Sequence, residues 1–119
     1  MPNPQAQARL RMVASKLSLP FTAVWGSQLL PPGDYDVFLL ASEPAPVVVI
    51  HGVGVSAMLV PSVVVLREKA RLNSVFFTAG DAPPRVHLMR LARVGMDLQF
   101  QEVASHDPRP IRLPLHETD

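Results

Sequence analysis

Apolar residues occupy every second position through residues 17–25 of the chain. These positions carry Leu17, Leu19, Phe21, Ala23 and Trp25. In a β-strand, every second side chain points to the same face. The pattern therefore predicts a strand that places these side chains in a protein core.

A turn and a second strand are expected directly after this run. Gly26 and Ser27 interrupt the apolar pattern, and residues 28–30 resume it. Pro32 and Gly33 then occupy the central positions of a predicted type II turn, which requires a positive φ at the glycine. Apolar side chains alternate again through residues 35–40. We expect a β-meander whose second long strand is covered on both faces over its latter half.

Short apolar runs separated by turn residues continue along the chain. They predict strands at residues 47–50, 55–60, 62–66, 75–79 and 97–103. The glycines on either side of Val53 predict a tight turn or bulge. Pro61 removes a ladder donor, so the strand there is expected to bend or to pass to a second sheet. The charged residues 67–73 predict a solvated turn.

Residues 85–94 fit the rules for a helix and for a strand. Pro84 before the segment, Gly95 after it and arginines near its end are typical of a helix. As a strand, the segment places Val86 and Leu88 on one face. We favour the strand because the neighbouring segments are predicted strands.

The spacing of strands and turns predicts an all-β fold. About seven to eight short strands separated by turn signals indicate a small antiparallel β-sandwich or a partly open β-barrel. We expect an N-terminal tail over residues 1–16, a single β domain over residues 17–103 and a proline-containing C-terminal tail over residues 104–119. Within the second tail, alternating apolar residues could add a strand to the chain's own sheet or to a neighbour's; they are Ile111, Leu113 and Leu115.

Composition narrows the possible functions. The chain has 119 residues and 48% hydrophobic content, which suits one domain with an aliphatic core. It has no cysteine, so disulfides, thiolate nucleophiles and cysteine-ligated zinc are excluded. The net charge of +1 gives no general electrostatic case for nucleic-acid binding. No apolar run approaches the roughly 18 residues of a membrane-spanning helix, so membrane insertion is not expected.

The first meander also carries a resemblance. It resembles the "PF…V…G…LPAGxYxV" signature of small secreted β-domain proteins of uncharacterised function that are common in Acidobacteria; the matching residues are Leu19-Pro20-Phe21, Val24, Gly26, Leu30-Pro31-Pro32-Gly33, Tyr35 and Val37. Pro32 stands where the family has alanine. The resemblance implies a β fold and export, hence a secreted or periplasmic protein, and implies no activity. Ala6-Gln7-Ala8 has the small-x-small form of a signal-peptidase site, although no hydrophobic region precedes it.

Candidate catalytic chemistry is sparse. The histidines, which are His51, His87, His106 and His116, show no metal-ligand spacing on any predicted element. The glycine-rich residues 51–56 faintly resemble an oxyanion loop, but no G-x-S-x-G motif accompanies them, and a hairpin turn is favoured. Asp34 and Asp36 share a predicted strand face beside a turn, where two acids usually form a solvated edge rather than a catalytic carboxylate pair. They could also contribute to a calcium site. We expect no enzyme and no cofactor.

The arginines of residues 85–94 raise the question of a basic surface. Arg85, Arg90 and Arg93 could gather with His87. A strand, however, would divide them between two faces. Nucleic-acid binding by small barrels also needs stacking aromatic residues, and the segment has none in its own sequence.

The sequence therefore predicts a non-enzymatic structural or protein-interaction module. Self-association is expected through sheet edges or through the tails, with Ile111, Leu113 and Leu115 as candidate interaction residues. The alternative is a β-barrel that binds a small apolar ligand. Trp25 and Tyr35 are predicted to be core aromatics.

Overall fold

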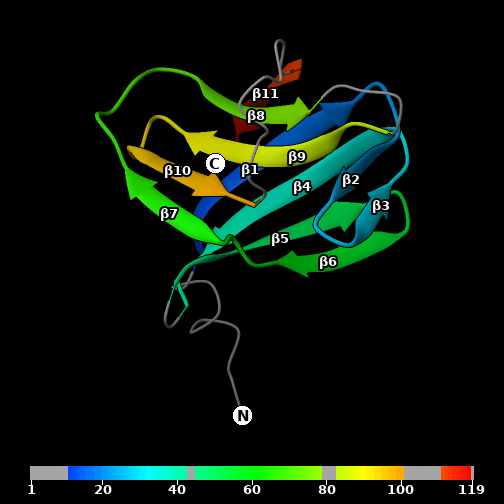
Figure 1. The fold of residues 1–119 in the computed structure, drawn as a ribbon, viewed down its shortest axis with the longest axis horizontal. Helices are drawn as coiled ribbons and strands as arrows, with labels where there is room; N and C mark the ends of the chain where they lie inside the picture. The colour runs from blue at the N-terminus through cyan, green and yellow to red at the C-terminus, as the bar shows by residue number, and fades with distance from the viewer. Residues whose placement is uncertain (1–10, 43–44, 79–82, 101–110, 119) are drawn as a thin grey trace.

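The computed structural model describes residues 11–42, 45–78, 83–100 and 111–118, and these form strands and turns without a helix (Figure 1). The strands are β1 (Arg11–Leu19), β2 (Ala23–Trp25), β3 (Gln28–Leu30), β4 (Gly33–Leu40), β5 (Val47–Gly52), β6 (Val55–Leu59), β7 (Val63–Leu66), β8 (Asn73–Thr78), β9 (Arg85–Leu91), β10 (Met96–Gln99) and β11 (Ile111–Glu117). The all-β prediction is confirmed.

These strands form a nearly closed, barrel-like sheet (Figure 1). The hydrogen-bonded order is β3-β2-β9-β8-β11-β1-β4-β5-β6, and β10 pairs with both β9 and β7. β6 pairs with β5, whereas β7 pairs with β10. The chain bends at Pro61, between β6 and β7, and so passes from one part of the barrel wall to the other. The predicted effect of this proline is confirmed.

The sheet contains 11 strands, more than the seven to eight that the turn spacing predicts. Part of the difference lies in the first predicted strand, which is divided into β1 and β2 around residues 20–22. β2 and β3 form a three-residue hairpin, and β2 makes a parallel contact with β9 at the pair Val24 and Arg85. The predicted interruption at Gly26 and Ser27 and the resumed run over residues 28–30 are confirmed by this hairpin.

The termini are more ordered than the predicted tails. β1 begins at Arg11, so the boundary of the N-terminal tail at residue 16 is wrong. The reason is pairing: β1 lies beside β4 along most of its length, which a view of its weakly apolar sequence does not reveal. At the other end, β11 lies inside the sheet between β8 and β1. The remaining tail residues, 1–10 and 101–110, lie outside the described part of the chain.

The barrel interior is filled by side chains that alternate inward along the strands. The largest fully buried ones include Trp25, Tyr35, Phe77, Leu17, Leu30, Leu39, Ile50 and Met89. Each contributes about 1.5–3 kcal/mol by leaving water. Trp25 also packs edge-on against Phe100, with ring centroids 5.4 Å apart. The prediction that Trp25 and Tyr35 are core residues is confirmed.

The first residue of β4 lies against the turn between β5 and β6. Gly33 has a φ of +146°, and a Cβ atom there would lie 2.6 Å from Cγ2 of Val53. Val53 and Gly54 form the two-residue turn between β5 and β6, with φ values of 53° and 76°. The positive φ at Gly33 and the tight hairpin turn are thus confirmed. The predicted type II turn is wrong, because Gly33 is already the first residue of β4 and its φ of +146° differs from the value of about +80° that this turn requires. Val53 itself is strained, because β-branched residues rarely adopt positive φ.

Residues 85–91 form a strand, as favoured over the helix. The turn at residues 92–95 leads directly into β10. Leu98 of β10 is fully buried, and the charged residues 67–72 between β7 and β8 are exposed. The predicted solvated turn is confirmed for residues 67–72, whereas Asn73 is buried and begins β8.

Candidate interaction surface

β7 is an edge strand with an apolar outer surface. Within the described residues it pairs only with β10. Its exposed side chains are Val63 (47% exposed), Val65 (40%) and Leu66 (78%), while Val64 turns inward against the core. Proteins usually shield such an edge with charge, proline or a cover, because unpaired strand edges recruit other strands. This edge is therefore a candidate interaction site.

The backbone geometry indicates which groups of β7 remain unpaired. The Arg67 N–H donates to the Gly95 carbonyl at 2.8 Å, in the same register that pairs Val65 with Asp97. In an antiparallel ladder, alternate residues direct their N–H and C=O groups to opposite sides. Residues 63, 65 and 67 therefore face β10. The backbone groups of Val64 and Leu66 point to the open edge.

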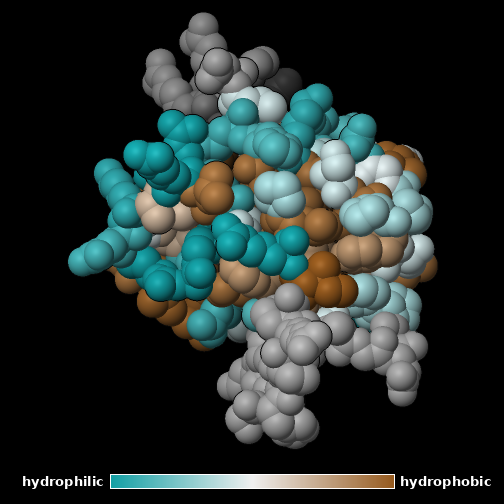
Figure 2. Space-filling view, turned by 90° about the horizontal axis from the view of Figure 1, so that it is seen from above, coloured by the Kyte–Doolittle hydropathy of each residue, from teal (hydrophilic) through white to brown (hydrophobic). Residues whose placement is uncertain are grey.

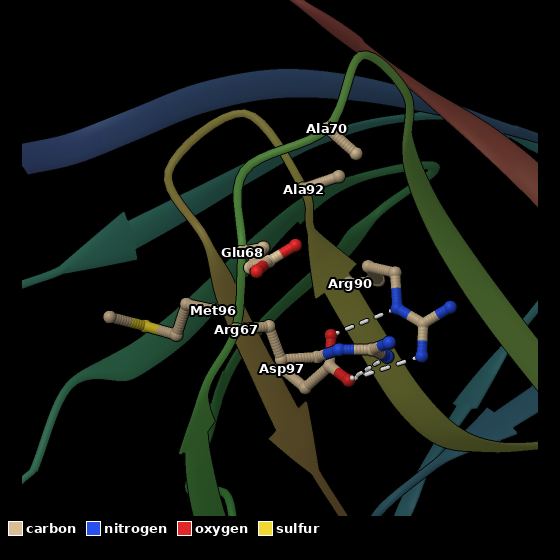
Figure 3. A pocket seen from close by; sticks show the side chains of 7 residues that line it. All are labelled: Arg67, Glu68, Ala70, Arg90, Ala92, Met96 and Asp97. Carbon is tan, nitrogen blue, oxygen red and sulfur yellow. Dashed lines mark hydrogen bonds and ion pairs between the residues drawn. The ribbon is translucent and has the colours of Figure 1, made fainter.

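An ion-pair cluster lies beside this edge on the same outer face. Asp97 lies between Val65 of β7 and Arg90 of β9 in the sheet register. Its carboxylate accepts bonds from Arg67 at 2.9 Å and from Arg90 at 3.0 and 3.1 Å (Figure 3). A cavity of about 120 Å³ adjoins the cluster, with Met96 and Glu68 among its lining residues (Figure 3). The cluster clamps the end of β7 to β10 and β9.

The protonation of Asp97 follows from these contacts. Burial tends to raise the pKa of Asp97, but hydrogen bonds and positive charge from Arg90 and Arg67 outweigh this effect, so the pKa is lowered from its ordinary value. Asp97 is only 5% exposed, so loss of its charge would leave two guanidinium groups without their partner. The role of the carboxylate is therefore structural: it links Arg67 to Arg90 as an ionised partner.

Phe76 extends this outer face toward β8 and β11. The guanidinium carbon of Arg90 lies 5.2 Å from the Phe76 ring centroid, and that of Arg112 lies 5.8 Å from it. Arg112 also donates from Nε to the Ser74 hydroxyl at 3.0 Å. No aromatic residue lies near Arg90 in the sequence, because Phe76 is distant along the chain. Only the pairing of β8 with β9 brings them together.

The predicted basic grouping of residues 85–94 is dispersed. Arg85 donates to the Gly26 carbonyl at one end of β9. Arg93, beyond the other end, pairs with Glu117 at 3.0 Å. Arg90 binds Asp97 between them. The three arginines therefore have separate partners and do not form one basic patch.

Ile111, Leu113 and Leu115 pack against the chain's own core. Leu115 is 5% exposed, and the other two are partly buried against the same cluster. β11 pairs with β8 from Ile111 to Leu115 and with β1 at His116 and Glu117. Of the two possibilities for this segment, the structure has a strand in the chain's own sheet. Its apolar side chains are consequently not a free interaction surface.

Asp34 and Asp36 share the outward face of β4, as predicted, and each contacts a residue of β1. Asp34 accepts a bond from Ser18 at 2.8 Å, and Asp36 lies 3.9 Å from Lys16. His51 and His116 are exposed, and His106 lies outside the described residues. Among the residues that the structure describes, no group of three or more histidine, cysteine or acidic side chains could hold a metal ion. The described residues also contain no helix long and apolar enough to cross a membrane.

Two buried aromatic side chains, Tyr35 and Trp25, carry polar groups in the barrel interior. The Tyr35 hydroxyl donates to the Pro31 carbonyl, and burial raises the pKa of Tyr35. The Nε1 atom of the fully buried Trp25 has no hydrogen-bond partner among the described residues. An unsatisfied buried donor costs about 1–3 kcal/mol. The surrounding apolar packing must offset this cost.

Comparisons with known proteins identify no relative. No family model matches the chain, no curated protein matches it, and no solved structure matches it. The resemblance to secreted β-domain proteins therefore stays a prediction that rests on the residues of the first meander.

Proposed function

We propose that this protein is a non-enzymatic interaction module that self-associates through the open edge of β7. The observation that supports the proposal most directly is the coincidence, on one strand, of an unpaired edge with exposed Val65 and Leu66. Strand addition supplies affinity through main-chain bonds and register through alternating side chains.

A second copy fits this edge in a specific register. If two β7 strands pair antiparallel about a twofold axis at Val65, Val64 of one copy lies opposite Leu66 of the other. These residues carry the backbone groups that point to the open edge, so each such pair can exchange both hydrogen bonds. Val65 then faces its own copy across the axis, and the register brings no two like charges opposite each other. The strand is thus self-complementary.

The other edge strands offer less. β3 spans three residues and exposes one large apolar side chain, Leu29. On β6, the exposed Met58 shares its face with the polar Ser56, while Ala57 packs against the core and Leu59 is buried; Val60, which is 69% exposed, lies just past the strand. These differences favour β7 over β3 and β6. The filled interior likewise favours a surface function over the alternative of an internal apolar ligand.

The test introduces a charge at the proposed centre of the interface. Val65→Lys should convert an oligomer to a monomer, since lysine on an edge strand opposes edge-to-edge pairing. Molar mass would be measured by sedimentation velocity across a range of protein concentrations. Leu29→Lys and Met58→Lys place the same charge on the other edge strands and should leave the mass of the wild type unchanged.

Two results would contradict the proposal. One is a wild-type chain that stays monomeric at all concentrations. The other is an oligomer that survives Val65→Lys but dissociates with Leu29→Lys or Met58→Lys. Circular dichroism of each variant checks that the fold is retained, as the 40% exposure of Val65 leads us to expect.

A further inference from the structure

One end of the barrel exposes apolar side chains at its tip. The connection between β7 and β8 lies beside the turn between β9 and β10 (Figure 1). At this end, Leu72 is 65% exposed and Val94 is 39% exposed. The Arg93 N–H donates to the Asn73 side chain at 3.1 Å, so Leu72 and Val94, the sequence neighbours of these two residues, lie on segments that are bonded to each other. Neither side chain packs into the core.

The β7–β8 connection and the β9–β10 turn are hydrogen-bonded and in close contact at this tip. The Ala70 N–H donates to the Ala92 carbonyl at 2.8 Å. Gly95 has a φ of +78°, and a Cβ atom there would lie 2.5 Å from the Arg67 carbonyl oxygen. The connection therefore passes so close to the turn that only glycine fits. The exposed apolar groups are held in place without cover from the described chain.

Basic side chains surround these apolar groups. Lys69 and Arg71 are exposed and have no ion pair among the described residues, while Arg93 pairs with Glu117. Glu68, exposed beside Lys69 on the same connection, carries one opposing charge, so two positive groups and one negative group leave a net charge of +1. Arg71, Arg93 and His116 line an open cavity of about 220 Å³ with Leu72. In Figure 2, whose horizontal direction is that of Figure 1, hydrophilic groups project at this left-hand end next to apolar ones.

We propose that this tip docks on the surface of an anionic phospholipid bilayer. Leu72 and Val94 would enter the interfacial layer, and Lys69 and Arg71 would contact lipid phosphates. Aliphatic groups beside a net positive charge suit such a surface, because apolar burial and charge attraction act together there. Nucleic acid fits less well, since the tip presents no aromatic side chain for base stacking. A second copy of the tip would oppose like charges.

The experiment measures co-sedimentation of the full chain with lipid vesicles. Vesicles of phosphatidylcholine mixed with phosphatidylglycerol should bind the protein, and vesicles of phosphatidylcholine alone should not. Lys69→Gln and Arg71→Gln should each weaken binding about fivefold, as expected for loss of one cation near an anionic membrane. Leu72→Ser should weaken it further at unchanged charge, and because Leu72 is exposed it should not impair folding.

Matched variants at the opposite end of the barrel serve as controls. Arg85→Gln and Leu29→Ser remove the same kinds of side chain there and should leave vesicle binding unchanged. The Val65→Lys variant, which tests β7 pairing, retains the tip and should still bind mixed vesicles.

Three results would overturn the proposal. The first is no binding to mixed vesicles. The second is binding that the control variants reduce as much as Arg71→Gln does. The third is binding that Leu72→Ser leaves intact while added salt abolishes it, because a polyanion-binding patch without apolar insertion would behave in this way.

Discussion

β7 and β11 are short apolar strands with opposite environments. β11 carries Ile111, Leu113 and Leu115, and the chain's own sheet pairs it on both sides. β7 carries valines and a leucine, and within the described residues only one of its edges is paired. Their sequences alone suggest the reverse, because β7 is a continuous apolar run, typical of a strand covered on both faces, whereas β11 alternates. The difference indicates that the neighbours of a strand, rather than its own pattern, decide whether apolar residues stabilise the fold or remain available to a partner.

The largest expected effect is a loss of folding stability when the buried strand of this pair, β11, is truncated in the core. Leu115→Ala should lower the free energy of unfolding by about 2–5 kcal/mol, because it leaves a cavity in the core. Chemical denaturation monitored by tryptophan fluorescence would measure the loss. Val65→Ala on β7 is the matched variant, and at low protein concentration it should change stability by less than about 1 kcal/mol. Equal losses for the two variants would mean that β7 is also core.

Gly33, the first residue of β4, tests the contact between this strand and the turn that follows β5. Gly33→Val should cost about 1–3 kcal/mol, because valine would adopt a positive φ and contact Val53. Thermal unfolding would measure the change. A variant with wild-type stability would show that the backbone at residue 33 has been assigned wrongly.

The ion-pair cluster determines how firmly the β7 edge is held. Asp97→Asn should cost about 1–3 kcal/mol at neutral pH by removing the charged partner of Arg67 and Arg90. The folded-state pKa of Asp97 is lowered, so its stabilisation is present above the unfolded pKa of about 3.9 and is lost as pH falls through the folded value.

The difference in stability between wild type and Asp97→Asn should therefore be constant near neutral pH and shrink in acid below about pH 3.9. Urea denaturation over this range would follow it. A difference that grows toward acid would contradict the assigned role of the carboxylate. Asp36→Asn, whose carboxylate lies 3.9 Å from Lys16, is the exposed control.

The smallest expected effect is a gain in stability at an exposed turn. Val53→Asn should stabilise the protein by up to about 1 kcal/mol, because asparagine tolerates the positive φ that a type I′ turn requires. Differential scanning calorimetry would measure the shift in Tm. A loss of stability would mean that the contact of Val53 with Gly33 outweighs the backbone strain.

Much of the fold follows from local sequence. Alternation predicts β4, and short apolar runs bounded by turn residues predict β5, β6 and β8, because these side chains must leave water. Gly33 predicts its own positive φ, and Pro61 predicts the bend between β6 and β7, since both effects depend on the backbone of a single residue. The strand over residues 85–91 follows from context and not from its own pattern.

Tertiary structure decided the rest, because it depends on pairings between distant segments. The sequence by itself determined an all-β chain with an aliphatic core. Only the sheet order placed β11 inside the barrel and β7 at its edge. Only the β8–β9 register set Phe76 beside Arg90, and only the contact of the β7–β8 connection with the β9–β10 turn gathered Leu72, Val94 and their cations at one tip. Local pattern fixes which face of a strand is apolar, whereas pairing fixes which strands remain uncovered.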